Sequence, residues 1–223
     1  DNDEARPDEY PKHKIEISSF WMDETEVTNA QFKEFVDATG YITTAERSIN
    51  WDEIKSMLPP GTPKPNDSLL SPSSLVFKES NTSNLNDYSK WWSLVRDANW
   101  KQPFGPGSNI EGKDDYPVVH ISWEDANEYC KWAGKRLPTE AEYEYASRGG
   151  LINEIYSWGN QKVNDGNLKA NIWEGIFPKS NSLNDKFYYA SPVKSFSPNN
   201  YGLFDMAGNV WEWCSDWYHA NYY

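Results

Sequence analysis

Few side chains of this 223-residue chain have the types and spacing that redox or transition-metal chemistry needs. The two cysteines, Cys130 and Cys214, form no CxxC pair and allow at most one internal disulfide. The three histidines, His13, His120 and His219, lie far apart in the sequence. Zinc and iron sites need several such ligands at close spacing. The sequence therefore predicts neither a zinc nor an iron site.

Capping signals predict three short helices that would position the remaining polar groups. Thr28 and Gln31 form a capping box that opens the first helix, in which Phe32 and Phe35 lie on one face and Gly40 marks the end. Two further capping boxes pair Ser122 with Asp125 and Thr139 with Glu142, in helices that end at Gly134 and Gly149.

The segments ahead of the first two helices, residues 15–22 and 118–121, read as strands. Residues 51–115 are punctuated by prolines, which favours long loops over helices. Phe77 and Trp100 lie within these loops, and rings of this size favour ordered packing over a flexible linker.

Composition favours one domain built around aromatic rings. Hydrophobic residues make up 38% of the chain, but aromatic residues make up 16% and include 12 tryptophans. The core is therefore expected to consist of large rings joined by polar loops. The length suits a single domain spanning residues 1–223.

The net charge of −13 disfavours nucleic acids and anionic membrane surfaces as partners, because both are negatively charged. The same excess of carboxylates is compatible with calcium binding, although a solvated acidic surface is the alternative for any single carboxylate. No window approaches the apolar length of a membrane span.

Several strings of residues together resemble the formylglycine-generating enzyme, or sulfatase-modifying-factor, family. Two strings are the most specific, WAGKRLPTEAE at 132–142 and GLFDMAGNVWEW at 202–213. Shorter ones are FWMD at 20–23, EVTN at 26–29, ATGY at 38–41 and PVVHISW at 117–123. Three more, SLVF at 74–77, WW at 91–92 and GP at 105–106, resemble the branch of true sulfatase activators.

The resemblance implies an α+β domain with little regular secondary structure, related to the C-type-lectin-like architecture. It also implies an extracytoplasmic protein, whether periplasmic, secreted or a lipoprotein. Enzymes of this family oxidise one cysteine in a CxPxR-type motif of an unfolded sulfatase to formylglycine, using oxygen, copper(I) and a pair of active-site thiols. The implied partner is therefore an unfolded sulfatase polypeptide.

Members of the family continue past the Trp-Glu-Trp string to the cysteine pair, and they begin with an entry strand ahead of the residue that matches Asp1. The chain is therefore expected to be a fragment of a longer protein, without the catalytic segment and its copper ligands, and no catalytic residue is assigned in it. Cys130 resembles a family cysteine whose disulfide partner would lie in that segment, with a small buried hydrophobe as the alternative. Two thiols, rather than a disulfide between Cys130 and Cys214, are predicted for this chain.

Two calcium sites are implied by the resemblance. The first would use the side chains of Asn171 and Asp185 and the carbonyls of Ile172 and Phe187, in loops of the kind that suit calcium. Turn residues are the alternative for the Asn and the Asp.

The second site would use the side chains of Asp205 and Glu212 and the carbonyls of Gly208 and Val210. The i, i+3, i+5, i+7 spacing suits a chain wrapped around an ion. A helix that begins with Asp205 as its N-cap is the alternative.

The resemblance also places Trp211 near the substrate groove and Ser74 in a loop that borders it. A core position is the alternative for Trp211, and a turn for Ser74. His120 reads as a hydrogen-bonded core histidine and is left out of the site. Lys135 and Arg136 read as part of a structural corner between two helices.

Two functions remain open for the parent protein. The first is the copper-dependent oxidase that matures sulfatases. The second is a non-catalytic relative of the same fold that serves as a binding or scaffold domain of an extracytoplasmic protein. Sulfoxide-synthase-type iron chemistry would need a histidine-rich partner domain, which this sequence does not contain.

Overall fold

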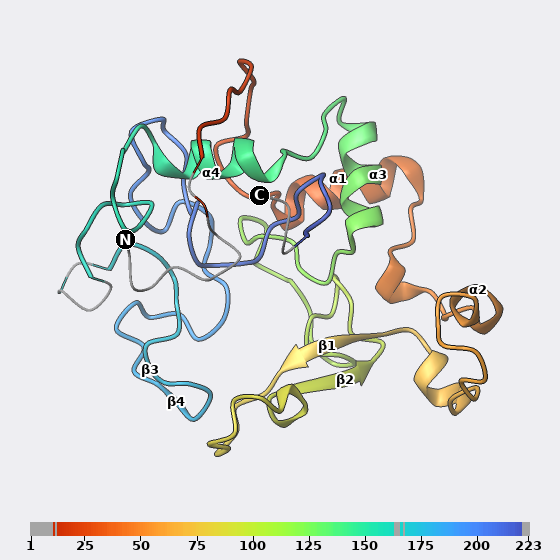
Figure 1. Cartoon of the computed structure of the whole chain (residues 1–223). Helices are drawn as coiled ribbons and strands as arrows, with labels where there is room; N and C mark the ends of the chain where they lie inside the picture. Colours follow the sequence, from red (N-terminus) through yellow and green to blue (C-terminus); the bar gives the residue numbers. More distant parts are fainter. Residues whose placement is uncertain (1–10, 12, 163–165, 167, 220–223) are drawn as a thin grey trace. The chain divides into compact units, whose positions relative to one another are not determined.

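Short helices and strands joined by long loops make up the structure, a computed structural model that describes residues 11, 13–162, 166 and 168–219 (Figure 1). The prediction of an α+β fold with little regular secondary structure is confirmed. The α-helices are α1 (Asn29–Thr39), α2 (Trp51–Lys55), α3 (Trp123–Trp132) and α4 (Glu140–Arg148). The strands are β1 (Ser73–Phe77), β2 (Trp92–Arg96), β3 (Gly175–Ile176) and β4 (Ser180–Asn181), and short 3-10 turns occupy Thr44–Glu46, Asp67–Leu70 and Tyr88–Lys90.

The chain separates into two units, which are described one at a time. The first unit contains residues 1–26, 136–172 and 193–223, and the second contains residues 27–135 and 173–192. None of the helices in the described part of the chain has the length and apolar character to cross a membrane.

An aromatic cluster forms the core of the second unit. It consists of Phe32 and Phe35 from α1, Tyr129 from α3 and Trp100 from a loop, each at most 6% exposed. Phe32 meets Trp100 edge to face at 5.3 Å between ring centroids, a geometry that aromatic pairs favour. Helices α1 and α3, which carry three of these rings, contact each other and cross (Figure 1). The loop residue Trp100 is thus packed, as its size predicted.

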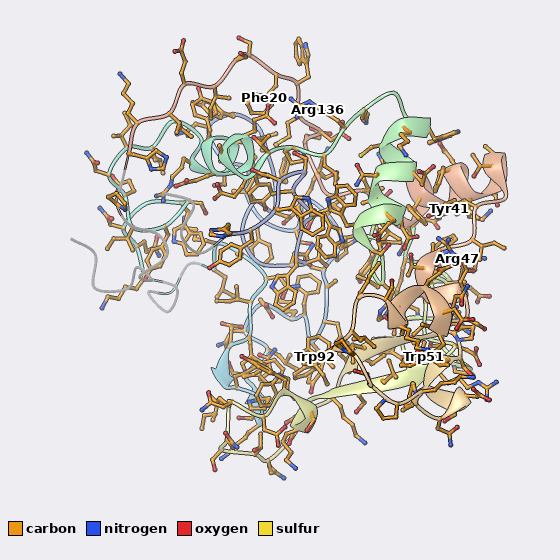
Figure 2. The ribbon with its side chains drawn as sticks, turned by 45° about the vertical axis from the view of Figure 1, so that its right-hand side comes forward. Phe20, Tyr41, Arg47, Trp51, Trp92 and Arg136 are labelled. Atoms are coloured by element: carbon orange, nitrogen blue, oxygen red, sulfur yellow. The ribbon has the colours of Figure 1, made fainter. Side chains whose placement is uncertain are left out.

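Helix α3 begins at a buried carboxylate that also holds the preceding loops. Ser122 and Asp125 form the predicted capping box, and Asp125 is fully buried. Asp125 accepts hydrogen bonds from the Tyr41 hydroxyl at 2.9 Å and from the Thr44 backbone N–H at 2.9 Å. Arg47 lies 3.6 Å from the same carboxylate and donates to the Tyr41 hydroxyl at 3.1 Å, and Figure 2 labels Arg47 next to Tyr41. These contacts with Asp125 hold the loop that follows α1 in place.

Strands β1 and β2 pair antiparallel, with Ser74 opposite Val95 and Leu75 opposite Leu94. The two expected strands, by contrast, are not formed, so both predictions are wrong. Residues 118–121 belong to no strand, and only Pro117 just ahead of them makes an isolated bridge, with Thr28. His120 takes a left-handed conformation with φ of 59°, which ends any extended run. Residues 15–22 pair with no strand in the described part of the chain, and Trp21 projects fully into solvent.

Helix α4 organises the first unit. Thr139 and Glu142 form its predicted capping box, and Gly149 ends it in the left-handed region. Arg136, labelled in Figure 2, donates two hydrogen bonds of 2.7 Å to the two carboxylate oxygens of Glu142. A bidentate pair of this kind fixes geometry as well as charge. The interpretation of this segment as a structural corner agrees with that pairing.

Candidate functional site

The loop 205–212 of the first unit carries the residues predicted for the second calcium site. It is not helical, and Asp205 itself adopts a left-handed backbone with φ of 51°. The alternative of a helix capped by Asp205 is therefore wrong. Asp205 is buried, and its Oδ2 accepts the Lys194 backbone N–H at 2.7 Å.

Asn209 connects this loop to two other segments of the same unit. Its backbone N–H donates to the Asn171 carbonyl at 2.8 Å, and its Oδ1 accepts from the Asn171 side chain at 3.1 Å. Its Nδ2 donates to Oε1 of Glu26 at 2.8 Å. The three hydrogen bonds hold the loop 205–212 in one conformation.

Gly208 is required where the loop passes Asn171. A Cβ at this position would lie 2.3 Å from the Asn171 carbonyl oxygen, a distance no real Cβ tolerates. The backbone φ of 77° also favours glycine. The two backbones therefore approach as closely as glycine alone permits, in the loop whose carbonyls are predicted to face a cation.

Glu26 adds a third carboxylate that the sequence did not predict for this site. Its side chain is 7% exposed, and its Oε2 has no hydrogen-bond partner. Burial raises the pKa of Glu26 to about 7, and the negative charges of Asp205 and Glu212 add to that shift. We call Glu26, Asp205 and Glu212 the acidic cluster.

The third member of the acidic cluster, Glu212, accepts a hydrogen bond from the Tyr143 hydroxyl at 2.9 Å. The same hydroxyl lies 3.3 Å from the carbonyl oxygen of Met206. Burial, together with the nearby charge of Glu212, raises the pKa of Tyr143 far above its ordinary value. Tyr143 therefore stays protonated and holds the end of the loop 205–212 against α4.

These residues fit a calcium ion. Calcium prefers hard oxygen donors. The site offers the buried Oε2 of Glu26, which has no hydrogen-bond partner, two further carboxylates and the carbonyls of the loop. Across the described residues, no group of three or more His, Cys, Asp or Glu side chains is arranged to hold a metal by side chains alone. An ion here would therefore depend on carbonyl oxygens such as those of Gly208 and Val210.

The residues predicted for the first calcium site are divided between the units, with Asn171 and Ile172 in the first and Asp185 and Phe187 in the second. Asp185 is buried, its Oδ1 accepts the Phe187 backbone N–H at 2.9 Å, and its Oδ2 has no hydrogen-bond partner. Assembly of the four residues into one site stays a prediction.

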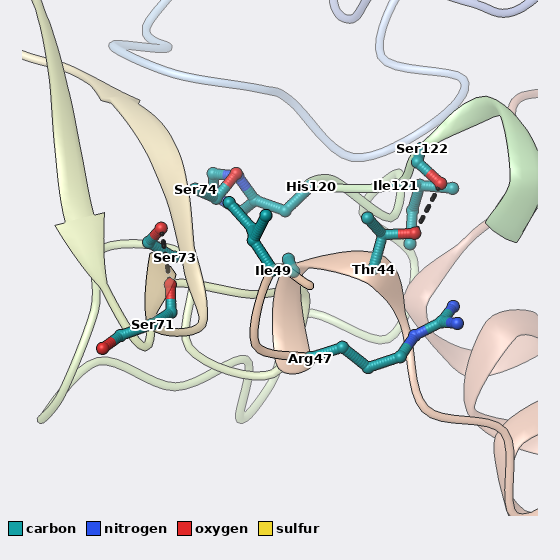
Figure 3. A pocket seen from close by; sticks show the side chains of 10 residues that line it. Thr44, Arg47, Ile49, Ser71, Ser73, Ser74, His120, Ile121 and Ser122 are labelled. Atoms are coloured by element: carbon teal, nitrogen blue, oxygen red, sulfur yellow. Dashed lines mark hydrogen bonds between the residues drawn. The ribbon is translucent and has the colours of Figure 1, made fainter. Parts of the chain in front are cut away.

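A cavity of about 260 Å³ opens in the second unit and contains Ser74 in its wall (Figure 3). The Ser74 hydroxyl lies 2.7 Å from Nδ1 of His120, and Nε2 of His120 lies 2.8 Å from the Pro103 carbonyl oxygen. His120 is thus hydrogen-bonded, as the sequence predicted, but it also lines the cavity. Burial lowers its pKa below the ordinary value for histidine.

Trp211 belongs to the first unit and is 96% exposed, so the alternative of a core position is wrong. Ser74 lines the cavity of the second unit rather than serving only a turn. A shared substrate groove for these two residues stays a prediction.

The two cysteines do not fit a copper(I) centre. Cys130 packs on α3 against the aromatic cluster. Burial raises the pKa of Cys214 to about 11, with the charges of Asp216 and Glu140 adding to the shift. Copper(I) needs thiolates, so no step through copper is derived for this chain. Their state as two thiols stays a prediction.

Comparisons with known proteins agree on one family. The family model described as "Sulfatase-modifying factor enzyme 1-like domain" matches residues 1–223. A Streptomyces coelicolor protein named formylglycine-generating enzyme is 44% identical over 215 residues, which cover 96% of this chain and 63% of that protein. The Mus musculus protein of the same name is 42% identical over 222 residues, which cover 98% of this chain and 55% of that protein.

Two further relatives bear on function and fold. A Bos taurus protein named inactive C-alpha-formylglycine-generating enzyme 2 is 40% identical over 228 residues, which cover 99% of this chain and 67% of that protein. Among solved structures, PvdO from Pseudomonas aeruginosa matches with a TM-score of 0.55 at 23% identity, over 97% of this chain and 64% of that chain. The chain spans between about half and two thirds of the length of these proteins.

Proposed function

Because this chain belongs to the sulfatase-modifying factor enzyme 1-like domain family, we propose that the whole protein oxidises a sulfatase cysteine to formylglycine. The observation that carries the proposal is identity of 42–44%, along nearly the whole chain, to proteins named formylglycine-generating enzyme. The proposed substrate is a cysteine in a CxPxR-type motif of an unfolded sulfatase.

Copper(I) would supply the oxygen-activating redox chemistry in the whole protein. Cys130 and Cys214 are poor candidates for its ligands, since one packs on a helix face and the other has a pKa of about 11. The part of the reaction assigned to this chain is therefore structural and substrate-binding. The proposed substrate contacts are Trp211, which is exposed on the loop 205–212, and Ser74, which lies in the wall of the cavity.

Calcium is the proposed structural cofactor of the loop 205–212. The orphaned Oε2 of Glu26 and the close approach at Gly208 support this assignment. Extracellular and periplasmic fluids hold enough free calcium to fill sites of modest affinity. For this reason we also propose an extracytoplasmic location, and cell fractionation with an antibody to the chain tests it.

A non-catalytic scaffold is the second candidate function. It is favoured by the similarity to the Bos taurus protein whose name calls it inactive, which covers 99% of this chain.

One assay distinguishes them. Residues 1–223 and the whole protein are each incubated with a CxPxR-type peptide, copper(I) and oxygen, and mass spectrometry follows the conversion of the thiol to an aldehyde. The whole protein is expected to convert the peptide, and residues 1–223 alone are not. An inactive whole protein that still binds the peptide would support the scaffold, and turnover by residues 1–223 would contradict the assignment of the chemistry to other segments.

A further inference from the structure

The two hydrogen bonds of His120 fix where its proton lies. The Pro103 carbonyl can only accept, so Nε2, 2.8 Å away, carries the hydrogen. The lowered pKa of His120 favours the neutral ring, whose Nδ1 then has a lone pair. That lone pair accepts the Ser74 hydroxyl hydrogen at 2.7 Å. Ser74 is thus hydrogen-bonded to a base that is oriented by a third group.

The pair is accessible to a ligand, because Ser74 and His120 both line the cavity (Figure 3). Uncharged side chains make up much of the remaining wall. The hydroxyls of Thr44 and Ser122 lie 2.8 Å apart, and Ser73 donates to the Ser71 carbonyl. A wall of this kind suits a neutral polar ligand.

Arg47, the one cationic side chain among the described residues that line the cavity, points toward Asp125 rather than toward Ser74. Its guanidinium lies 3.6 Å from Asp125, and Figure 3 shows it pointing away from Ser74 and His120. A negatively charged ligand at Ser74 would therefore find no cation to pair with among the residues that Figure 3 draws next to it.

The backbone of His120 is held in an unusual conformation. Its φ of 59° lies in the left-handed region, which is unfavourable for a residue with a side chain. Both ring nitrogens are engaged, and these contacts hold the ring against Ser74. Strain of this kind often accompanies functional side chains.

We propose that Ser74 and His120 form a nucleophile–base pair that hydrolyses small, neutral acyl esters in this cavity. Ser74 Oγ forms a bond to the ester carbonyl carbon while its hydrogen moves to Nδ1 of His120. The bond to the alcohol oxygen breaks, and that oxygen takes the proton from Nδ1. Water then attacks the acyl-Ser74 in the same way, which releases the carboxylic acid and restores the hydroxyl.

The group that orients His120, the Pro103 carbonyl, limits the rate of the proposed hydrolysis. It is a carbonyl rather than a carboxylate, and no Asp or Glu is among the residues that line the cavity in the described part of the chain. The imidazolium that forms during each step gains little stabilisation. Turnover is therefore slow, and covalent capture of Ser74 is the sharper measurement.

The test is labelling of folded residues 1–223 with a fluorescent fluorophosphonate, followed by peptide mapping. In this reaction Ser74 Oγ bonds to phosphorus, its hydrogen moves to Nδ1 of His120, and fluoride leaves. We expect one labelled site at Ser74 and no labelling of Ser74→Ala. The variant Ser93→Ala, which changes a half-buried serine on β2 outside the cavity wall, is the matched control and labels normally.

The base is tested with His120→Asn, because asparagine tolerates a left-handed backbone. Labelling of this variant should be about 100-fold slower, which is the usual contribution of a general base, while its circular dichroism stays unchanged. Absence of label on Ser74 in the folded chain would overturn the proposal. An equal labelling rate in folded His120→Asn would overturn the role of the base. Neither outcome depends on the sulfatase reaction.

Discussion

The Asn209 side chain donates a hydrogen bond of 2.8 Å to Oε1 of Glu26, across 183 residues of sequence. This contact joins the string at 202–213 to the string at 26–29, and it leaves the other oxygen of Glu26 buried without a partner. The two motifs lie far apart in the sequence, and this hydrogen bond joins them beside the acidic cluster.

The pH dependence of stability without divalent cations should report Glu26. Its pKa rises from 4.5 in the unfolded chain to about 7 in the folded chain. Between these values the folded state holds a proton that the unfolded state has lost, so the free energy of unfolding falls as the pH rises. The loss should reach roughly 3 kcal/mol above pH 7.

Glu26→Gln should reduce this slope, because glutamine keeps an acceptor for Asn209 and has no charge. The slope that remains belongs to Glu212 and Asp205, whose pKa values burial also raises. Urea unfolding in EDTA from pH 4.5 to 8 measures it. Glu16→Gln, an exposed residue of the same unit, is the control and should keep the slope. An identical pH profile for Glu26→Gln and the wild type would show that the buried carboxylate does not control stability.

Calcium should stabilise the chain. If the dissociation constant is about 10 μM, free calcium at about 1 mM adds roughly 2.7 kcal/mol to the free energy of unfolding. Titration calorimetry should show about two sites, with Asp205→Asn and Glu212→Gln weakening one of them. A melting temperature that is the same in EDTA and in calcium would contradict both predicted sites.

Gly208→Ala should destabilise the first unit beyond the cost of backbone strain. The new Cβ would lie 2.3 Å from the Asn171 carbonyl oxygen, so the loop 205–212 must move. Gly202→Ala is a matched control, since Gly202 has a similar φ of 80° and no atom within 4 Å of the added Cβ. We expect the two variants to differ by about 2 kcal/mol in urea unfolding, and equal values would argue against the close approach.

Helices α1, α3 and α4 were predictable because their signals are local, whereas α2 lies in the segment 51–115, where the prediction of loops rather than helices was wrong for Trp51–Lys55. Each capping box spans four residues, and Thr28, Ser122 and Thr139 all occupy the predicted N-cap positions. Strands β1 and β2 were not predictable from local signals, because the pairing of residues 73–77 with 92–96 depends on contacts between segments that are distant in the sequence. Leu75 and Leu94 are apolar but exposed, so these strands lack the alternation of buried apolar and exposed polar residues that usually marks a half-buried strand.

The candidate site was predictable only in part. Family resemblance indicated Asp205 and Glu212 as candidates, whereas the position of Glu26 beside them depends on the tertiary contact with Asn209. The string EVTN at 26–29 was a usable signal, because it begins with a carboxylate within a specific motif. His120 was set aside because no carboxylate partner was apparent, and its actual partners are a hydroxyl and a carbonyl.

Arg136→Lys should lower stability through the loss of one of two hydrogen bonds to Glu142. An ammonium group cannot reproduce the planar pair, which leaves one buried carboxylate oxygen weakly satisfied. We expect a loss of about 1–2 kcal/mol. Arg96→Lys, at a largely exposed pair with Asp97, is the control and should change stability by less than about 0.5 kcal/mol. Similar losses in both variants would mean that the bidentate geometry contributes little.

Cys214 should react slowly with alkylating reagents, because its pKa of about 11 keeps the thiol protonated. At pH 8 the thiolate fraction is about 0.1%, against roughly a quarter for an ordinary cysteine. Iodoacetamide should therefore modify Cys214 about 100-fold more slowly in the folded chain than in urea. Asp216→Asn should accelerate the reaction several-fold, since it removes one of the negative charges that raise the pKa. Mass spectrometry of the peptide that contains Cys214 measures both rates. Fast modification of the folded wild type at pH 7 would show an activated thiol, and Cys214 would then become a candidate nucleophile or copper ligand.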